Sequence, residues 1–243
     1  MKQKELDDAL DLKGFLSPSM GFVRESLKAA YKNSFADAEL SSDDAQRSMM
    51  EAEVSQRDIH MLASLIFLQR TIRSCQAAII LCEKGLVVDA QTLTRAALEA
   101  LFHGVALIND PTVFAKIARK GDEEEGKQAY GMLQTLKDYG LTEQNIKDLE
   151  EIASRGEGKG LKLNVFDAAR IANLLPLYHA FYRGLSNIAS HATVRSMDSS
   201  FAVSDDSWSL VTGPTEQHLE LTLRLVRTCL DLSCKALDDN FKR

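Results

Sequence analysis

The chain has 243 residues, of which 45% are hydrophobic and 26% charged, and its formal net charge is −6. This composition suits a globular protein with one substantial core. The acidic balance excludes a surface coated with basic residues for general nucleic-acid binding. With only four prolines and thirteen glycines, the class is predicted to be all-α. We expect a single-domain helical bundle, in which residues 1–40 form an N-terminal helical arm and residues 41–243 the bundle.

The cellular location is predicted from the N-terminus, the apolar runs and the cysteines. The first eight residues lack the apolar segment of a signal peptide. No apolar run is expected to approach the roughly 20 residues that span a bilayer. The four cysteines never form a C-x-x-C pair and are interpreted as reduced packing residues. We therefore expect a cytoplasmic protein that has no membrane partner.

A helical hairpin is predicted at the centre of the bundle. Apolar residues at helical spacing indicate a long helix from about Asp43 to Lys84, which ends at Gly85. The chain then returns antiparallel as a helix over residues 86–108. The polar first half of the long helix has no obvious partner within the chain. That half favours a homodimer.

The pattern after the hairpin is weaker. One or two helical turns are expected over residues 113–119, followed by an acidic loop over residues 121–126, because such charge runs are usually solvated surface. Two modest helices are expected over residues 127–139 and 142–154, and Thr142 caps the second.

The last third of the chain contains a connector, two helical segments and a hairpin. A flexible connector is expected over residues 156–160, and Asn164 can cap the following helix. Pro176 must kink this helix or begin a new segment. A change to alternating hydrophobicity over residues 201–211 predicts a small β-hairpin. A final helix is expected to end near residue 237.

The helix over residues 177–191 carries more polar groups on one face than packing requires. Within about 80° of Arg183 around this helix lie two imidazoles, two hydroxyls and an amide: His179, Ser186, Asn187, Ser190 and His191. The opposite side is apolar. The helix can therefore bury that side and present the polar residues as a site.

A second polar pattern lies on the 86–108 helix, where Arg95, Glu99 and His103 recur at i, i+4 and i+8. On one interpretation Arg95 and Glu99 form a solvated i,i+4 pair. On the other, their apolar neighbours bury the pair, which then needs further partners from the polar helix. Tyr182 and Ser186 complete this set of candidate binding residues, and both interpretations stay open.

The motifs of several enzyme classes are absent, which narrows the chemistry. H-E-x-x-H, paired Glu-x-x-His and G-x-S-x-G do not occur, and we expect neither a metal nor another cofactor. Metal-free RNA cleavage needs a histidine to transfer protons and an arginine to stabilise phosphate charge. His191 and Arg183 are the candidates, and Asn187 and Ser190 would position the phosphodiester.

Arg183 and His191 resemble the motif of HEPN helical ribonucleases, in which four to six residues separate an arginine from the histidine that follows it. Seven residues separate them here, and Gly184 stands where a polar residue often follows the arginine. The resemblance implies a metal-independent endoribonuclease or an RNA-binding protein of a defence or toxin kind.

The chain also resembles an uncharacterised bacterial all-helical family, DUF5677, over roughly residues 60 to 235. The residues that carry the resemblance are Gly85, Leu86, Ala90, Leu93, Arg95 and Glu99 on one helix, and Tyr178, Tyr182, Leu185, Ser186 and His191 on the other. The resemblance implies that the two helices belong together, but it implies no activity. The alternative to an RNA-directed enzyme is a non-enzymatic module that dimerises or binds a protein, whose polar cluster only fixes helix packing.

Overall fold

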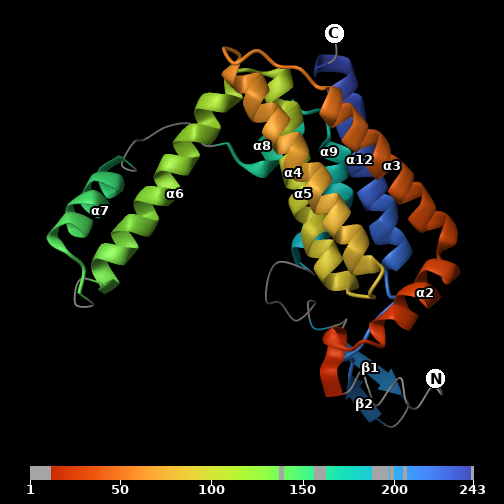
Figure 1. Ribbon diagram of the computed structural model, residues 1–243. Helices are drawn as coiled ribbons and strands as arrows, with labels where there is room; N and C mark the ends of the chain where they lie inside the picture. The colour runs from red at the N-terminus through yellow and green to blue at the C-terminus, as the bar shows by residue number, and fades with distance from the viewer. Residues whose placement is uncertain are drawn as a thin grey trace.

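In the computed structural model, four long helices form the bundle, as the all-α prediction requires (Figure 1). They are α3 (Lys32–Glu51), α4 (Ile59–Cys82), α5 (Val87–Asn109) and α12 (Leu219–Phe241). The structure describes residues 12–136, 140–155, 163–187, 197, 200–204 and 207–241.

Contacts along the helices fix their directions. Asp37 of α3 pairs with Arg227 of α12, and further along the same two helices Ser48 contacts Cys234, so α3 and α12 run parallel. In the α4–α5 hairpin the hydroxyl of Ser64 donates to the Gly104 carbonyl at 2.8 Å. The absence of a side chain at Gly104 permits this close approach, because an added Cβ would lie 3.2 Å from Leu68.

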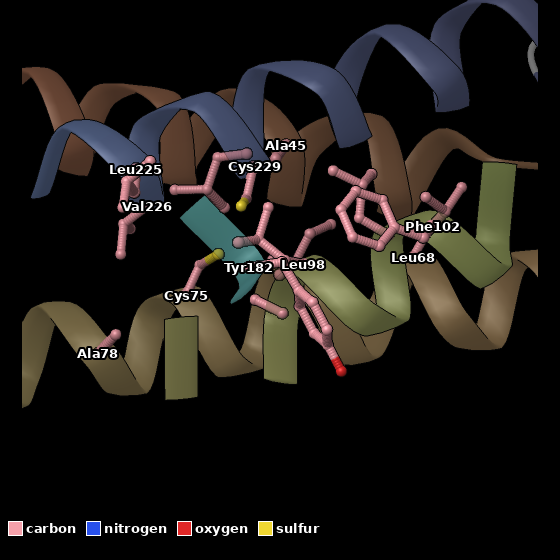
Figure 2. Close-up of a cluster of buried hydrophobic side chains, with 14 of the residues drawn as sticks. Ala45, Leu68, Cys75, Ala78, Leu98, Phe102, Tyr182, Leu225, Val226 and Cys229 are labelled. Atoms are coloured by element: carbon pink, nitrogen blue, oxygen red, sulfur yellow. The ribbon is translucent and has the colours of Figure 1, made fainter. Parts of the chain in front are cut away.

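The core lies where α4, α5 and α12 meet, and Figure 2 shows its central cluster. The thiols of Cys75 and Cys229 face each other there. All four cysteines are free, as expected, and burial raises the pKa of Cys75 well above its usual value. The Cys75 thiol is therefore a packing group that stays protonated.

Gly85 makes the turn between α4 and α5. Its φ is +70°, and the Leu86 amide donates to the Leu81 carbonyl while the Gly85 amide donates to the Cys82 carbonyl. This pair of bonds is the Schellman termination of a helix. The predicted stop is therefore confirmed.

The predicted single helix over residues 43–84 is wrong, because the chain leaves helical geometry between Glu51 and Ile59. The Glu53 amide donates instead to the carbonyl of Phe241 at the end of α12. Three serines of α3 are buried in the bundle: Ser41, Ser42 and Ser48. The polar half that favoured a homodimer thus has its partners within the chain.

The N-terminal segment contains η1 (Gly14–Leu16) and α2 (Met20–Ala30). Glu83, just after α4, accepts hydrogen bonds from Arg24 and Lys28 of α2. Burial alone would raise the pKa of Glu83, but these hydrogen bonds outweigh it and lower that pKa. Residue 40 falls inside α3, and the division into arm and bundle stays a prediction.

The predicted acidic loop over residues 121–126 is also wrong, because one helix, α6 (Val113–Leu136), runs through it. Lys127 pairs at 3.0 Å with both Glu123 and Glu124, one turn earlier, which offsets the charge repulsion of the acidic run. Gly126 is buried, and α6 packs against α7 (Glu143–Arg155) as a hairpin that projects from the bundle (Figure 1).

Two predicted helix caps are confirmed. The hydroxyl of Thr142 accepts a hydrogen bond from the Asn145 amide at the start of α7. The Asn164 side chain accepts one from the Asp167 amide at the start of α8 (Val165–Ile171). The connector over residues 156–160 lies outside the described residues.

Asn173 and Pro176 separate α8 from the next helical segment. Asn173 adopts a φ of 59°, and α9 (Leu175–Leu177) then begins with Pro176 in its first turn, so the proline begins a new segment. The predicted hairpin is confirmed as β1 (Phe201–Ser204) paired antiparallel with β2 (Ser207–Leu210).

One helix of the described chain, α4, is long and apolar enough to cross a membrane, contrary to the expectation from the sequence. Core helices of soluble proteins meet the same measure, and α4 packs against α5 and α12. The length and composition of α4 therefore indicate nothing about a membrane in either direction.

We predict that Gly85→Ala destabilises the protein by about 2 kcal/mol or more. An added Cβ would lie 2.7 Å from the Cβ of Pro214, and the alanine would have to adopt a left-handed backbone conformation. Gly131→Ala in α6 is the control, since nothing lies within 4 Å of its Cβ position, and it should stabilise by about 0.5–1 kcal/mol. Urea unfolding measures both; equal effects would contradict the assigned role of Gly85.

Candidate functional site

The helix that carries the predicted catalytic residues is distorted. After α9 it continues as the π-helix η2 (Tyr178–Tyr182) and as α10 (Arg183–Leu185). The Arg183 amide donates to the Tyr178 carbonyl five residues earlier. Such π-helical segments are rare and occur frequently at functional sites.

Aromatic packing fills the wider turn. The rings of Tyr178 and Tyr182 stack at 5.3 Å between centroids, and Phe102 of α5 meets the Tyr182 ring edge-on at 5.9 Å. Tyr182 is buried, and its hydroxyl points away from the core cluster (Figure 2). The π-helix thus seats the ring in the core and leaves the hydroxyl free to bond elsewhere.

The guanidinium of Arg95 joins α5 to this distorted helix. Its Nε donates to the Ser186 hydroxyl and its Nη2 to the Tyr182 hydroxyl, each at 2.8 Å. Its Nη1 lies 3.4 Å from the Glu99 carboxylate, and the carbon of the guanidinium lies 4.8 Å from the Tyr182 ring centroid. We call Arg95, Glu99, Tyr182 and Ser186 the arginine network.

The Tyr182 hydroxyl is a relay within the arginine network. It accepts from Arg95 and donates to Glu99 Oε2 at 2.9 Å. Burial, together with the Glu99 charge and hydrogen bond, raises the pKa of Tyr182 to about 12. The phenol therefore keeps its proton at neutral pH and can serve as this donor.

The structure falls between the two interpretations of the Arg95–Glu99 pair. The side chains are 23% and 34% exposed, so the pair is neither fully solvated nor fully buried. The polar helix supplies its further partners, as the second interpretation requires. All five candidate binding residues lie together. Four of them form the arginine network, and His103 is one turn beyond Glu99 on α5.

His103 is buried beside the arginine network. Its Nδ1 lies 2.7 Å from the Glu99 carbonyl, and its ring stacks on Phe67 with centroids 5.5 Å apart. Burial lowers the pKa of His103 against the opposing hydrogen bond and charge of Glu99, and the charges of Lys120 and Arg70 lower it slightly further. A neutral ring that donates from Nδ1 leaves Nε2 as an acceptor.

A groove of about 430 Å³ opens over His103 between α4, α5 and α6. Its lining includes Phe67, Arg70, Arg95, Glu99, His103 and Lys120. Sequence reasoning missed Arg70 and Lys120. Arg70 could have been noticed because it is an arginine inside the apolar α4. Lys120 could not, because the stretch after it was expected to be a loop rather than part of a helix facing the groove.

The four predicted catalytic residues are not brought together in the described structure. Arg183 and Asn187 are exposed and lie outside the arginine network. The guanidinium of Arg183 makes no hydrogen bond or ion pair within the described part of the chain. Ser190 and His191 lie outside the described residues. No group of three or more potential metal ligands occurs among the described residues.

We predict that Glu99→Ala destabilises the protein by about 1–2 kcal/mol, because it removes the acceptor of the Tyr182 hydroxyl and the counter-charge of Arg95. Glu220→Ala is the control. Glu220 forms an exposed i,i+4 pair with Arg224, so its removal should change stability by under about 0.5 kcal/mol. Urea unfolding compares the two, and a Glu99 effect as small as the control's would show that the network is not structural.

Comparisons with known proteins place the chain in a family. No curated protein and no solved structure matches the chain. Residues 61–207 match a family of unknown function, and the match includes both helices of the arginine network. The chain belongs to this family, DUF5677.

Proposed function

We propose that the protein is a metal-independent, HEPN-like ribonuclease that cleaves single-stranded RNA with Arg183 and His191. The observation that carries the proposal is an exposed Arg183, whose side chain has no partner among the described residues, at the end of a π-helix that the arginine network holds against α5. An arginine without a partner in a restrained helix is available to an anionic ligand.

The helix that carries Arg183 is restrained, which holds this exposed arginine in place for catalysis. Tyr182 and Ser186 precede and follow Arg183, and both are bonded to Arg95. The backbone that carries Arg183 is thus fixed on both sides, and little backbone entropy remains to be lost when a phosphate binds.

The proposed reaction needs no metal. The 2′-hydroxyl of the RNA attacks the adjacent phosphorus, the bond to the 5′-oxygen breaks, and a 2′,3′-cyclic phosphate and a 5′-hydroxyl form. His191 gives a proton to the leaving 5′-oxygen, while water takes the proton of the 2′-hydroxyl. Arg183 stabilises the negative charge that develops on the phosphate oxygens. Asn187 and Ser190 would position the phosphodiester.

The test is cleavage of a fluorescent single-stranded RNA by purified protein in EDTA. We expect cleavage by the wild type, and loss of at least about 100-fold in rate for Arg183→Ala and for His191→Ala. A substrate with 2′-deoxy sugars should resist cleavage, because the nucleophile is missing.

Two control variants separate catalysis from folding. Arg170→Ala removes another exposed arginine, and His179→Ala removes an exposed imidazole of the same helix; both should cleave at the wild-type rate. Thermal melts should show all four variants folded. Wild-type protein that neither cleaves nor binds the RNA, or equal losses in the controls, would contradict the proposal.

A second candidate function, self-association as an interaction module, is supported by the outer face of α4. Ile59, Leu62 and Ile66 are exposed there on one stripe, and contiguous apolar patches often mark interfaces. Ile59 and Ile66 lie on either side of Leu62, so a two-fold axis near Leu62 would seat Ile59 of one copy against Ile66 of the other. The occupant that fits is a second copy of the chain.

Light scattering tests this homodimer. We expect about twice the monomer mass at micromolar concentration, and a monomer after Leu62→Glu, because a stable interface buries over about 1,000 Å² and tolerates no charge at its centre. Ile80→Glu is the control on the same helix but outside the patch. A wild-type monomer, or dissociation by the control, would contradict self-association through this face.

The setting of the ribonuclease is also part of the proposal. We place it in the cytoplasm, with RNA as its substrate and a defence or toxin role. The free cysteines support this location, since disulfides are rare in reducing compartments.

A further inference from the structure

The groove over His103 carries an inference that does not depend on the ribonuclease proposal. Arg183 is not among the residues that line it. The groove is instead formed by α4, α5 and α6, and its charged side chains differ in whether they already have partners.

The acidic residues of the groove are already paired. Glu99 accepts from Tyr182 and pairs with Arg95. Glu124 pairs with Lys127 at 3.0 Å. Both carboxylates therefore already have cationic partners within the protein.

Two of the cations, in contrast, have no ion-pair partner among the described residues. The side chains of Arg70 on α4 and Lys120 on α6 form no hydrogen bond or ion pair within the described part of the chain. Both line the groove, Arg70 from α4 and Lys120 from α6, and both act electrostatically on His103. Two uncompensated cations that face one hollow attract an anion.

His103 adds a polar atom on the groove floor. Its Nδ1 donates a hydrogen bond to the Glu99 carbonyl. Its Nε2 has no partner in the described structure. No buried side-chain nitrogen or oxygen there lacks a partner, so Nε2 must reach solvent, and the groove is the hollow that His103 lines. A protonated Nε2 would donate to an anion bound there.

The size and the apolar part of the groove indicate more than an inorganic ion. Ala96, Ala100, Ile117 and the ring of Phe67 form its apolar wall. A volume of about 430 Å³ lies in the range of small-molecule sites, roughly 300–1,000 Å³. Such a groove fits an anionic group attached to a flat or apolar body.

We propose that this groove binds a nucleoside phosphate monoester, with its phosphate between Arg70 and Lys120 against His103 Nε2 and its nucleoside along the apolar wall. The phosphate carries up to two negative charges and several acceptor oxygens, which match two separate cations and one imidazole. The monoester can belong to a free nucleotide or to the phosphorylated end of an RNA.

Calorimetry with AMP on the full chain tests the site. We expect AMP to bind at least about tenfold more tightly than adenosine or inorganic phosphate, because each of these lacks half of the contacts. Arg70→Ala and Lys120→Ala should each weaken AMP binding about tenfold or more. The matched controls are Arg73→Ala on α4 and Arg119→Ala on α6, exposed cations outside the groove.

The histidine gives a second readout. Because the phosphate itself takes up a proton near pH 6, wild type is compared with His103→Gln at each pH. The groups facing His103 are Arg70 from α4, Arg95 and Glu99 from α5, and Lys120 and Glu124 from α6. Burial and the charges of Lys120 and Arg70 lower the pKa of His103. A bound anion should raise that pKa. The advantage of wild type over His103→Gln should therefore be larger at pH 6 than at pH 8.

Two RNA oligonucleotides, with and without a 5′-phosphate, separate the sources of the monoester. Tighter binding of the phosphorylated RNA than of AMP identifies an RNA end, and equal binding identifies a free nucleotide. Arg183→Ala should bind AMP as wild type does, so failure of the ribonuclease proposal leaves this one standing. Equal binding of AMP and adenosine, equal losses in the control variants, or no AMP binding at 1 mM would overturn it.

Discussion

The guanidinium of Arg95 is the group on which the geometry of the candidate site depends. It is held on α5 in the core hairpin, and its donors reach Tyr182 and Ser186 on a helix that is 87 to 91 residues later in the chain. An arginine can bond several acceptors in one plane, whereas a lysine presents a single charged point. One side chain thereby fixes both the position and the rotation of the distorted helix relative to the bundle.

The π-helix and the arginine network depend on each other. Regular α geometry advances the chain by about 100° per residue, and the wider turn at Tyr178–Tyr182 changes which side chains point toward α5. The ring of Tyr182 enters the core beside Phe102, while its hydroxyl meets Arg95 and Glu99. The cost of the irregular turn is offset by aromatic packing and by hydrogen bonds to charged groups.

The same network also shapes the groove over His103. Glu99 uses its carboxylate for the arginine network and its backbone carbonyl for His103. Engaging that carboxylate removes a counter-charge that Arg70 or Lys120 would otherwise find nearby. The proposed ribonuclease surface around Arg183 and the proposed nucleotide groove are therefore two separate sites that the arginine network joins. Self-association through α4 concerns a third surface.

Local chemistry in the sequence determined the helical class, the hairpin at Gly85, the caps at Thr142 and Asn164, and the β-hairpin. These features depend on residues a few positions apart, so a pattern of neighbours contains the needed information. The pairing of Arg95 with the polar helix was also predictable in outline, because a charged pair among apolar neighbours requires partners.

Only the tertiary structure decided the remaining features. At the break between α3 and α4 the Glu53 amide donates to the end of α12. Helix α6 stays helical through its acidic run because Lys127 pairs with Glu123 and Glu124 within it and α7 packs against it. The polar stripe around Arg183 divides, with Ser186 turned to Arg95 and Arg183 to solvent, because a π-turn changes the angle between side chains. The groove arises where Arg70, His103 and Lys120 meet from three helices, and helical periodicity carries no information about distances between helices.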